Sequence, residues 1–158
     1  MAEEELTQEQ EDAHIEEVLN GVESLRTHDL INSNFCGELD ELKDGTAVVK
    51  LMTTTDMRVD SHELVHGGFI FSAADFAAMA AVNDPYVVLS GATTSFLSPV
   101  RAGDEVVFKA KVRHKDGRKR EVDVVGMVLE IKVFEGLFKT VVLDKHVLNI
   151  DLMNVSKT

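Results

Sequence analysis

The chain has little cysteine, no long apolar run and a shortage of positive charge. A single cysteine, Cys36, excludes an internal disulfide and is consistent with a reducing cytoplasm. We expect Cys36 to act as a small apolar residue in a strand. No stretch of about 18 apolar residues could span a membrane, and the start MAEEELTQEQ is acidic where a secretory signal would be basic and then apolar. The net charge of −12 argues against general nucleic-acid binding.

The charge that is present is unevenly distributed. Acidic residues crowd the first 24 positions, which contain no lysine or arginine. Basic residues cluster instead between 109 and 120. Such a patch on an acidic protein can steer a small polyanion, although a solvated hairpin tip would have the same composition. Both interpretations stay open at this level.

The periodicity divides the chain into three parts. Thr7 with Gln10 matches a capping box, and an apolar stripe follows, so residues 8–26 are predicted to form an amphipathic helix. We therefore expect an acidic helical segment over 1–30, packed on the domain or on a partner. The remaining chain fits one domain over 31–150 and a short tail over 151–158.

The pattern of the domain predicts strands around one helix. Residues 35–42 and 46–53 look like strands flanking a turn at 43–45. An alanine-rich helix is predicted over 67–82, stopped by Asn83-Asp84-Pro85. Four more strands are predicted as a meander, with tight turns at Asp116-Gly117 and Glu135-Gly136, over 86–97, 104–115, 120–134 and 137–149. The fold class is therefore α+β, with a helix packed on a strongly curved antiparallel sheet.

The run HGGFIFSAAD, residues 66–75, carries the clearest chemical signal. Gly67 and Gly68 stand where a helix can begin, and free amides at a helix start bind anions or a developing oxyanion. Asp75 follows on the same apolar helix. Burying a carboxylate there costs free energy, so its presence suggests a functional role. Amide donors together with a carboxylate suggest chemistry on a carbonyl group.

The spacing of these groups implies a second subunit. Eight residues of α-helix rise roughly 12 Å, so Gly67 and Asp75 of one chain cannot both reach one carbonyl carbon. If the two groups cooperate, the second one comes from another copy of the chain. We therefore predict a symmetric homodimer.

A metal site is a competing interpretation of the preceding residues. His62 to His66 spell HExxH, which in zinc peptidases lies on a continuous helix. Here two glycines follow at once, Val59-Asp60-Ser61 has no helical pattern, and no third ligand is evident downstream. We expect no metal.

These motifs resemble hotdog-fold acyl-CoA thioesterases of the phenylacetate-pathway type. The resemblance covers about 57–148 and rests on three features in order: the HGG helix start, the acid eight residues later, and the segment Phe96-Leu97-Ser98-Pro99 to Gly103-Asp104. It implies that the amide of Gly67, together with that of Gly68, polarises the thioester carbonyl and that Asp75 of the other subunit acts as general base or nucleophile. His66 would line the site or hold the loop.

The same resemblance suggests residues that contact substrate or water. Asp60 stands where relatives often carry Asn or Gln, and Met79 where one branch has Thr. Polar strand residues could position water, and basic residues could meet the phosphates of coenzyme A. The candidates are Asp60, Met79, Ser90, Thr93, Thr94, Arg101, Arg113 and Arg118.

The strand segment VRAGDEVVFKAKV also resembles the acyl-CoA-binding domain of bacterial regulators of fatty-acid and phospholipid synthesis. Those regulators bind their ligand without hydrolysing it and carry a DNA-binding module that we do not expect in this chain. The expected activity is hydrolysis of acyl-CoA to free acid and coenzyme A, and the alternative is a non-catalytic acyl-CoA-binding regulatory or interaction protein. We expect a cytoplasmic homodimer, or a dimer of dimers, that needs no cofactor beyond the thioester itself.

Overall fold

The computed structural model describes residues 24–150. Most of the helix predicted over 8–26, and all of the 151–158 tail, lie outside the described residues. Of the residues in that predicted helix, the structure describes only 24–26, and these are irregular instead of helical. No helix among residues 24–150 is long and apolar enough to cross a membrane.

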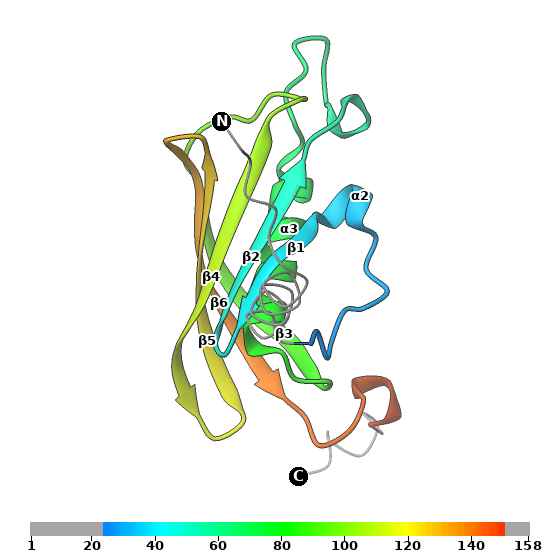
Figure 1. Ribbon diagram of the computed structural model, residues 1–158, viewed down its shortest axis with the longest axis vertical. Coiled ribbons are helices and arrows are strands. Elements are labelled where there is room, and N and C mark those ends of the chain that lie inside the picture. Colours follow the sequence, from blue (N-terminus) through cyan, green and yellow to red (C-terminus); the bar gives the residue numbers. More distant parts are fainter. Residues whose placement is uncertain (1–23, 151–158) are drawn as a thin grey trace, which may run out of the picture.

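Six antiparallel strands form one curved sheet that wraps a central helix (Figure 1). The spatial order is β1-β2-β4-β5-β6-β3. This arrangement confirms the α+β class and the curved antiparallel sheet. The strands are β1 (Glu38–Lys43), β2 (Thr46–Met52), β3 (Val87–Phe96), β4 (Glu105–Asp116), β5 (Lys119–Val128) and β6 (Ile131–Val142).

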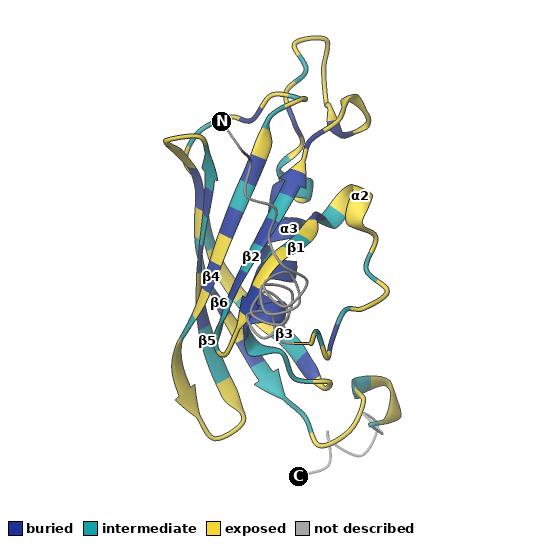
Figure 2. Cartoon of the chain, viewed as in Figure 1, coloured by how far each residue is buried: buried dark blue, intermediate teal, exposed yellow. Residues whose placement is uncertain are grey.

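The central helix, α3, runs from Gly67 to Val82, as predicted. Asn83 ends it in the left-handed conformation, with φ of 50°, and donates its N–H to the Met79 carbonyl. The alanines of α3 let the sheet approach closely, and most of the helix is buried against β2, β4 and β5 (Figure 2). The fully buried side chains Phe108, Phe134 and Phe138 fill the space between them.

The last hairpin differs from the prediction. The chain turns at Leu129-Glu130, and Glu135 and Gly136 lie inside β6 rather than in a turn. A Cβ on Gly136 would lie 3.0 Å from atoms of Phe138 and of Thr94, so this glycine serves close packing and not chain reversal. Leu129 takes the turn conformation instead, with φ of 51°. β6 ends at Val142, and the short 3-10 helix η2 (Val147–Asn149) occupies the end of the predicted strand.

The predicted four-strand meander is wrong in one respect. β4, β5 and β6 follow one another, but β3 pairs with β6 and lies at the edge of the sheet. Residues 97–104 connect β3 to β4 and pass the amino end of α3, where the Val65 N–H donates to the Val100 carbonyl. Buried Thr53 anchors this connection through its hydroxyl, which donates to the carbonyls of Arg101 and Asp104.

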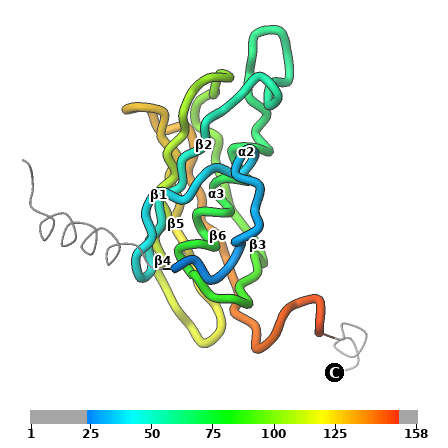
Figure 3. Tube along the Cα trace, turned by 45° about the vertical axis from the view of Figure 1, so that its right-hand side comes forward, coloured from blue at the N-terminus to red at the C-terminus, as the bar shows by residue number. Residues whose placement is uncertain are grey.

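Phe35 and Cys36 do not lie in a strand. They end the short helix α2 (Ser33–Cys36), which is capped by Asn32, whose side chain accepts from the Asn34 N–H. Gly37 ends α2 with φ of 84°. Figure 3 shows this segment running beside α3, and the Cys36 thiol lies 3.0 Å from the Ser72 hydroxyl. The prediction failed because capping by Asn32 and the left-handed glycine decide the local conformation.

Candidate active site

The amino end of α3 presents two backbone amides. His66 precedes the helix in an extended conformation; its N–H donates to the Met57 carbonyl and its carbonyl accepts from the Phe69 N–H. In the described part of the chain, no protein group accepts a hydrogen bond from the amides of Gly67 and Gly68. The pair is therefore free to bind an anion or a polarised carbonyl oxygen.

The His66 imidazole lies close to Gly68. A Cβ on Gly68 would lie 2.9 Å from Nε2 of His66, so the imidazole lies across the glycine. The ring is exposed and makes an edge contact with Phe69 at a centroid distance of 6.1 Å. The His66 imidazole thus stands beside the amide pair.

A small pocket opens at Gly67, and its lining side chains are apolar except for Ser98. Its volume is about 230 Å³, and Phe96 forms its nearest wall, since a Cβ on Gly67 would lie 3.4 Å from Cε1 of that ring. The pocket lies between the start of α3 and the segment that connects β3 to β4. It is lined by Leu64, Val65, Gly67, Ile70, Phe96, Ser98, Pro99, Val100 and Val133.

Asp75 lies two turns further along α3 in an unusual environment. Its Oδ1 atom is buried and has no hydrogen-bond partner among the described residues. Burial raises the pKa of the Asp75 carboxyl from 3.8 to about 6. A carboxyl group with a pKa just below neutrality is well suited to accept and return a proton.

Asp75 belongs to the side of α3 that the sheet leaves partly open. Gly68, Phe71, Ser72 and Asp75 follow one another at helical spacing, and none of them is fully buried. Ser72 on this stripe also contacts Cys36 of α2. The amides and Asp75 therefore lie on the same partly open side of α3, at different heights along the helix.

Two predicted substrate residues have local roles in the structure. Asp60 is exposed, and its Oδ1 accepts from the amides of His62 and Leu64, which holds the loop before the site. Met79 is 1% exposed and packs in the core. The HExxH segment is not helical, as its sequence indicated. In residues 24–150 no three His, Cys, Asp or Glu side chains are placed to hold a metal ion.

The polar candidates on β3 lie along the sheet edge. The Ser90 hydroxyl donates to the Lys139 carbonyl beside a bulge in the strand. Thr93 is exposed and Thr94 is half-buried. No hydrogen bond joins these three side chains to Asp75 within the part of one chain that the structure describes.

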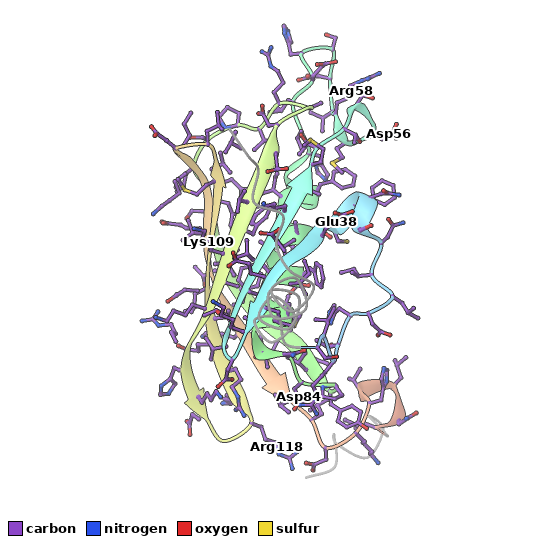
Figure 4. The ribbon with its side chains drawn as sticks, viewed as in Figure 1. Glu38, Asp56, Arg58, Asp84, Lys109 and Arg118 are labelled. Atoms are coloured by element: carbon purple, nitrogen blue, oxygen red, sulfur yellow. The ribbon has the colours of Figure 1, made fainter. Side chains whose placement is uncertain are left out.

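The basic candidates are scattered. Arg101 lies at the amino end of α3, where its backbone pairs with Leu64. Arg113 forms an ion pair with Asp123 at 3.5 Å, and Arg118 pairs with Asp144. Figure 4 shows Arg118 and Asp84 toward one end of the molecule and Arg58 toward the opposite end.

Three contributors to the site escaped the sequence interpretation. Leu64 and Val133 line the pocket at Gly67, and Arg58 pairs with Val65 just before the helix. Leu64 is adjacent in sequence to the HGG motif and could have been suspected on that ground. Val133 and Arg58 carried no such signal, because only the tertiary fold brings them to the amino end of α3.

Comparison with known proteins places these features in a family. Residues 62–133, which span both Gly67 and Asp75, match the Thioesterase superfamily. The chain is 38% identical over 85 residues to the acyl-coenzyme A thioesterase PaaI of Escherichia coli, covering 52% of this chain and 60% of that protein. It is 31% identical over 120 residues to the transcription factor FapR of Caldanaerobacter subterraneus, covering 75% of this chain and 60% of that one.

Another similar protein is named for an activity other than thioester hydrolysis or acyl-CoA binding. A methylthioribose-1-phosphate isomerase of Aquifex aeolicus is 50% identical over 119 residues, covering 75% of this chain but 26% of that protein. The chain thus spans between a quarter and three fifths of these curated relatives. Among solved structures, an uncharacterised protein of Pyrococcus horikoshii is 45% identical with a TM-score of 0.80, covering 81% of this chain and 98% of that one. Residues 62–133 therefore match the thioesterase superfamily, and the chain has the hotdog fold, as the motifs predicted.

Proposed function

We propose that this protein is a homodimeric acyl-CoA thioesterase whose site combines the Gly67 amide of one subunit with Asp75 of the other. The observation that carries the proposal is the Asp75 carboxyl, whose Oδ1 is buried with no hydrogen-bond partner among residues 24–150 and whose pKa is raised to about 6. An unpaired carboxyl group on an otherwise apolar helix destabilises the fold. Such a feature is typical of catalytic groups.

The need for two subunits follows from α3. Gly67 and Asp75 lie on this one unbroken helix, about 12 Å apart along its axis. A thioester carbon bound at the amide pair is therefore out of reach of the same chain's carboxylate. A twofold axis that sets two α3 helices side by side in opposite directions would bring each carboxylate to the partner's amides.

The two edges of the sheet differ in a way that favours such pairing. β1 at one edge has the sequence ELDELK, whose charges discourage association. β3 at the other edge has VVLSGATTSF over ten residues, with no charged residue and no proline. An uncharged edge of this length is suited to pair with a second copy of itself.

The chemistry needs one water molecule. The Gly67 N–H donates to the thioester oxygen and stabilises the oxyanion as it forms, which is typically worth about 3–4 kcal/mol. Asp75 takes a proton from water, and the hydroxide oxygen bonds to the carbonyl carbon. The carbon–sulfur bond then breaks, and the thiolate of coenzyme A takes the proton back from Asp75. Free acid and coenzyme A result. Direct attack by Asp75 would pass through an anhydride that water then opens.

The deciding experiment measures thiol release from a panel of acyl-CoAs by wild type and by Asp75→Ala. We expect the variant to lose at least about 100-fold in kcat, because it lacks the proton acceptor. Glu38→Gln, at an exposed carboxylate on β1, is the matched control and should be unaffected. Turnover that survives Asp75→Ala would refute the proposed mechanism.

The subunit arrangement has its own test. Sedimentation equilibrium should give a dimer for wild type, and Ala92→Glu, which places a charge on exposed β3, should shift it toward monomer with parallel loss of turnover. A wild-type monomer with full activity would exclude the shared site.

The similarity to FapR supports one alternative, a regulatory protein that binds acyl-CoA without hydrolysing it. It predicts tight acyl-CoA binding with no thiol release and no change on Asp75→Ala. The two functions therefore give opposite results in the same assay.

A further inference from the structure

The face of the sheet that points away from α3 carries a strip of aliphatic and basic side chains. Along β2 and β4, buried residues alternate with partly or fully exposed ones, as expected where only one face of a sheet covers the core. The buried set, which includes Val49 and Phe108, packs toward α3. The other set, with its neighbours on β5, forms what we call the outer strip: Thr46, Val48, Lys50, Val107, Lys109, Lys111, Val125 and Met127.

The outer strip combines two chemistries in direct cross-strand register. Lys109 lies between Val48 of β2 and Val125 of β5. Side chains in such positions are about 5 Å apart, so an aliphatic surface continues beneath the lysine amines. The ion pairs within residues 24–150 include neither Lys109 nor Lys111. The strip therefore suits an occupant that brings both apolar side chains and carboxylates.

The described part of the chain begins beside this strip. The side-chain amide of Asn83 donates to the Ser24 carbonyl at 3.0 Å, which fixes the first described residue at the end of α3. Ser24 lines a small pocket together with Gly45, in the turn between β1 and β2. The Gly45 carbonyl accepts from the N–H of Val112, the residue that follows Lys111 on β4. Residues 1–23 therefore join the domain next to one end of the outer strip.

We propose that the acidic segment 1–23 binds the outer strip of its own chain. The segment contains nine acidic residues and no lysine or arginine. Aliphatic residues recur in it at helical spacing from Ile15 to Val22, and acidic residues flank them. Leu25, the next residue of this series, is half-buried against the core. The segment thus offers apolar side chains and carboxylates together, as the strip requires.

The segment is long enough to cover the strip. Lys111 and Val107 lie four residues apart on β4, or about 13 Å. Even a fully helical run of 23 residues spans about 35 Å. The segment therefore reaches the far end of the strip, where Val107 and Lys109 line a surface hollow of about 580 Å³. A second copy of the sheet is a poorer occupant, because it would bring two sets of the same lysines into one interface.

Zero-length carbodiimide cross-linking of the full chain tests the contact, because this reagent joins a lysine amine to a carboxylate that touches it. An equal mixture of unlabelled and isotopically labelled protein distinguishes a bond within one chain from a bond between copies. We expect Lys109 and Lys111 to be joined to acids of residues 1–23 of the same chain. Lys145, exposed in the loop after β6, is the control and should form far fewer such bonds. Bonds only between copies, or equal yields at Lys145, would overturn the inference.

Charge reversal tests the same contact without a reagent. Lys109→Glu combined with Lys111→Glu should speed amide hydrogen exchange across the segment by about 10-fold, because the reversed charges repel its acids. Glu16→Lys with Glu17→Lys, added to that double variant, should restore slow exchange, which would not follow if the first pair had merely damaged the sheet. Lys145→Glu is the matched control and should leave the rate unchanged.

Salt provides a measurement on the wild-type chain, which decides the matter if circular dichroism shows that the Lys109 and Lys111 variants do not fold. Raising sodium chloride from about 0.1 M to about 1 M shortens the screening length from about 10 Å to about 3 Å and should speed exchange of the segment. Exchange that responds to neither salt nor charge reversal would overturn the inference and leave the strip to an external anionic partner. None of these measurements depends on thioester hydrolysis, so this inference and the proposed function stand or fall separately.

Discussion

Replacing Asp75 with asparagine should make the protein more stable and inactive. The folded state raises the pKa of this carboxyl from 3.8 to about 6 by burial. Each pKa unit is worth about 1.4 kcal/mol, so the ionised carboxylate destabilises the fold by roughly 3 kcal/mol at neutral pH. Asparagine has nearly the same shape and carries no charge. Removing the charge therefore removes the penalty.

The pH dependence has a definite sign. Between pH 3.8 and about 6 the folded state binds more protons at Asp75 than the unfolded state does, so the wild-type free energy of unfolding falls as pH rises through this window. Asp75→Asn should lack this fall. The variant should gain about 2–3 kcal/mol over wild type above pH 7 and almost nothing near pH 4.

Urea unfolding followed by far-ultraviolet circular dichroism measures the effect, because the chain contains no tryptophan for fluorescence. Glu38→Gln, at an exposed carboxylate, should stay within about 0.5 kcal/mol of wild type at every pH. A less stable Asp75→Asn above pH 7 would show that the carboxylate has a stabilising partner. That result would make Asp75 a structural residue and refute the catalytic reasoning.

Three further substitutions test one position at the site and two positions that hold neighbouring parts of the fold. Gly68→Ala would bring a Cβ to 2.9 Å from Nε2 of His66, displacing the ring, and should lower kcat by about 10-fold or more in the thiol-release assay while the unfolding midpoint changes little. Gly37→Ala combines φ of 84° with a Cβ 2.8 Å from the Lys50 oxygen, and should reduce the free energy of unfolding by about 2–4 kcal/mol in urea titration. Asn83→Ala removes the side chain that accepts from the Arg26 N–H at 2.7 Å and donates to the Ser24 carbonyl at 3.0 Å, so hydrogen exchange over residues 24–31 should accelerate; unchanged exchange would contradict this.

Local sequence signals were sufficient where a structure depends on near neighbours. Two glycines, a run of alanines and Asn83 specified the limits of α3, since helix start, packing and termination are all decided within a few residues. The HGG motif with Asp75 suggested chemistry on a carbonyl group and, through the rise of a helix, led to the expectation of a second subunit. The same signals misplaced the last turn, because the glycine at 136 is required by the rings of Phe134 and Phe138 and not by the backbone.

Only the tertiary structure decided what surrounds those groups. It placed β3 beside β6 at an open edge, carried residues 97–104 past the start of α3, and brought Phe96 and Val133 to Gly67. It also left Oδ1 of Asp75 buried with no hydrogen-bond partner in the part of the chain that the structure describes. Burial and pocket shape arise from contacts between residues far apart in the chain, and periodicity within a segment carries no information about them.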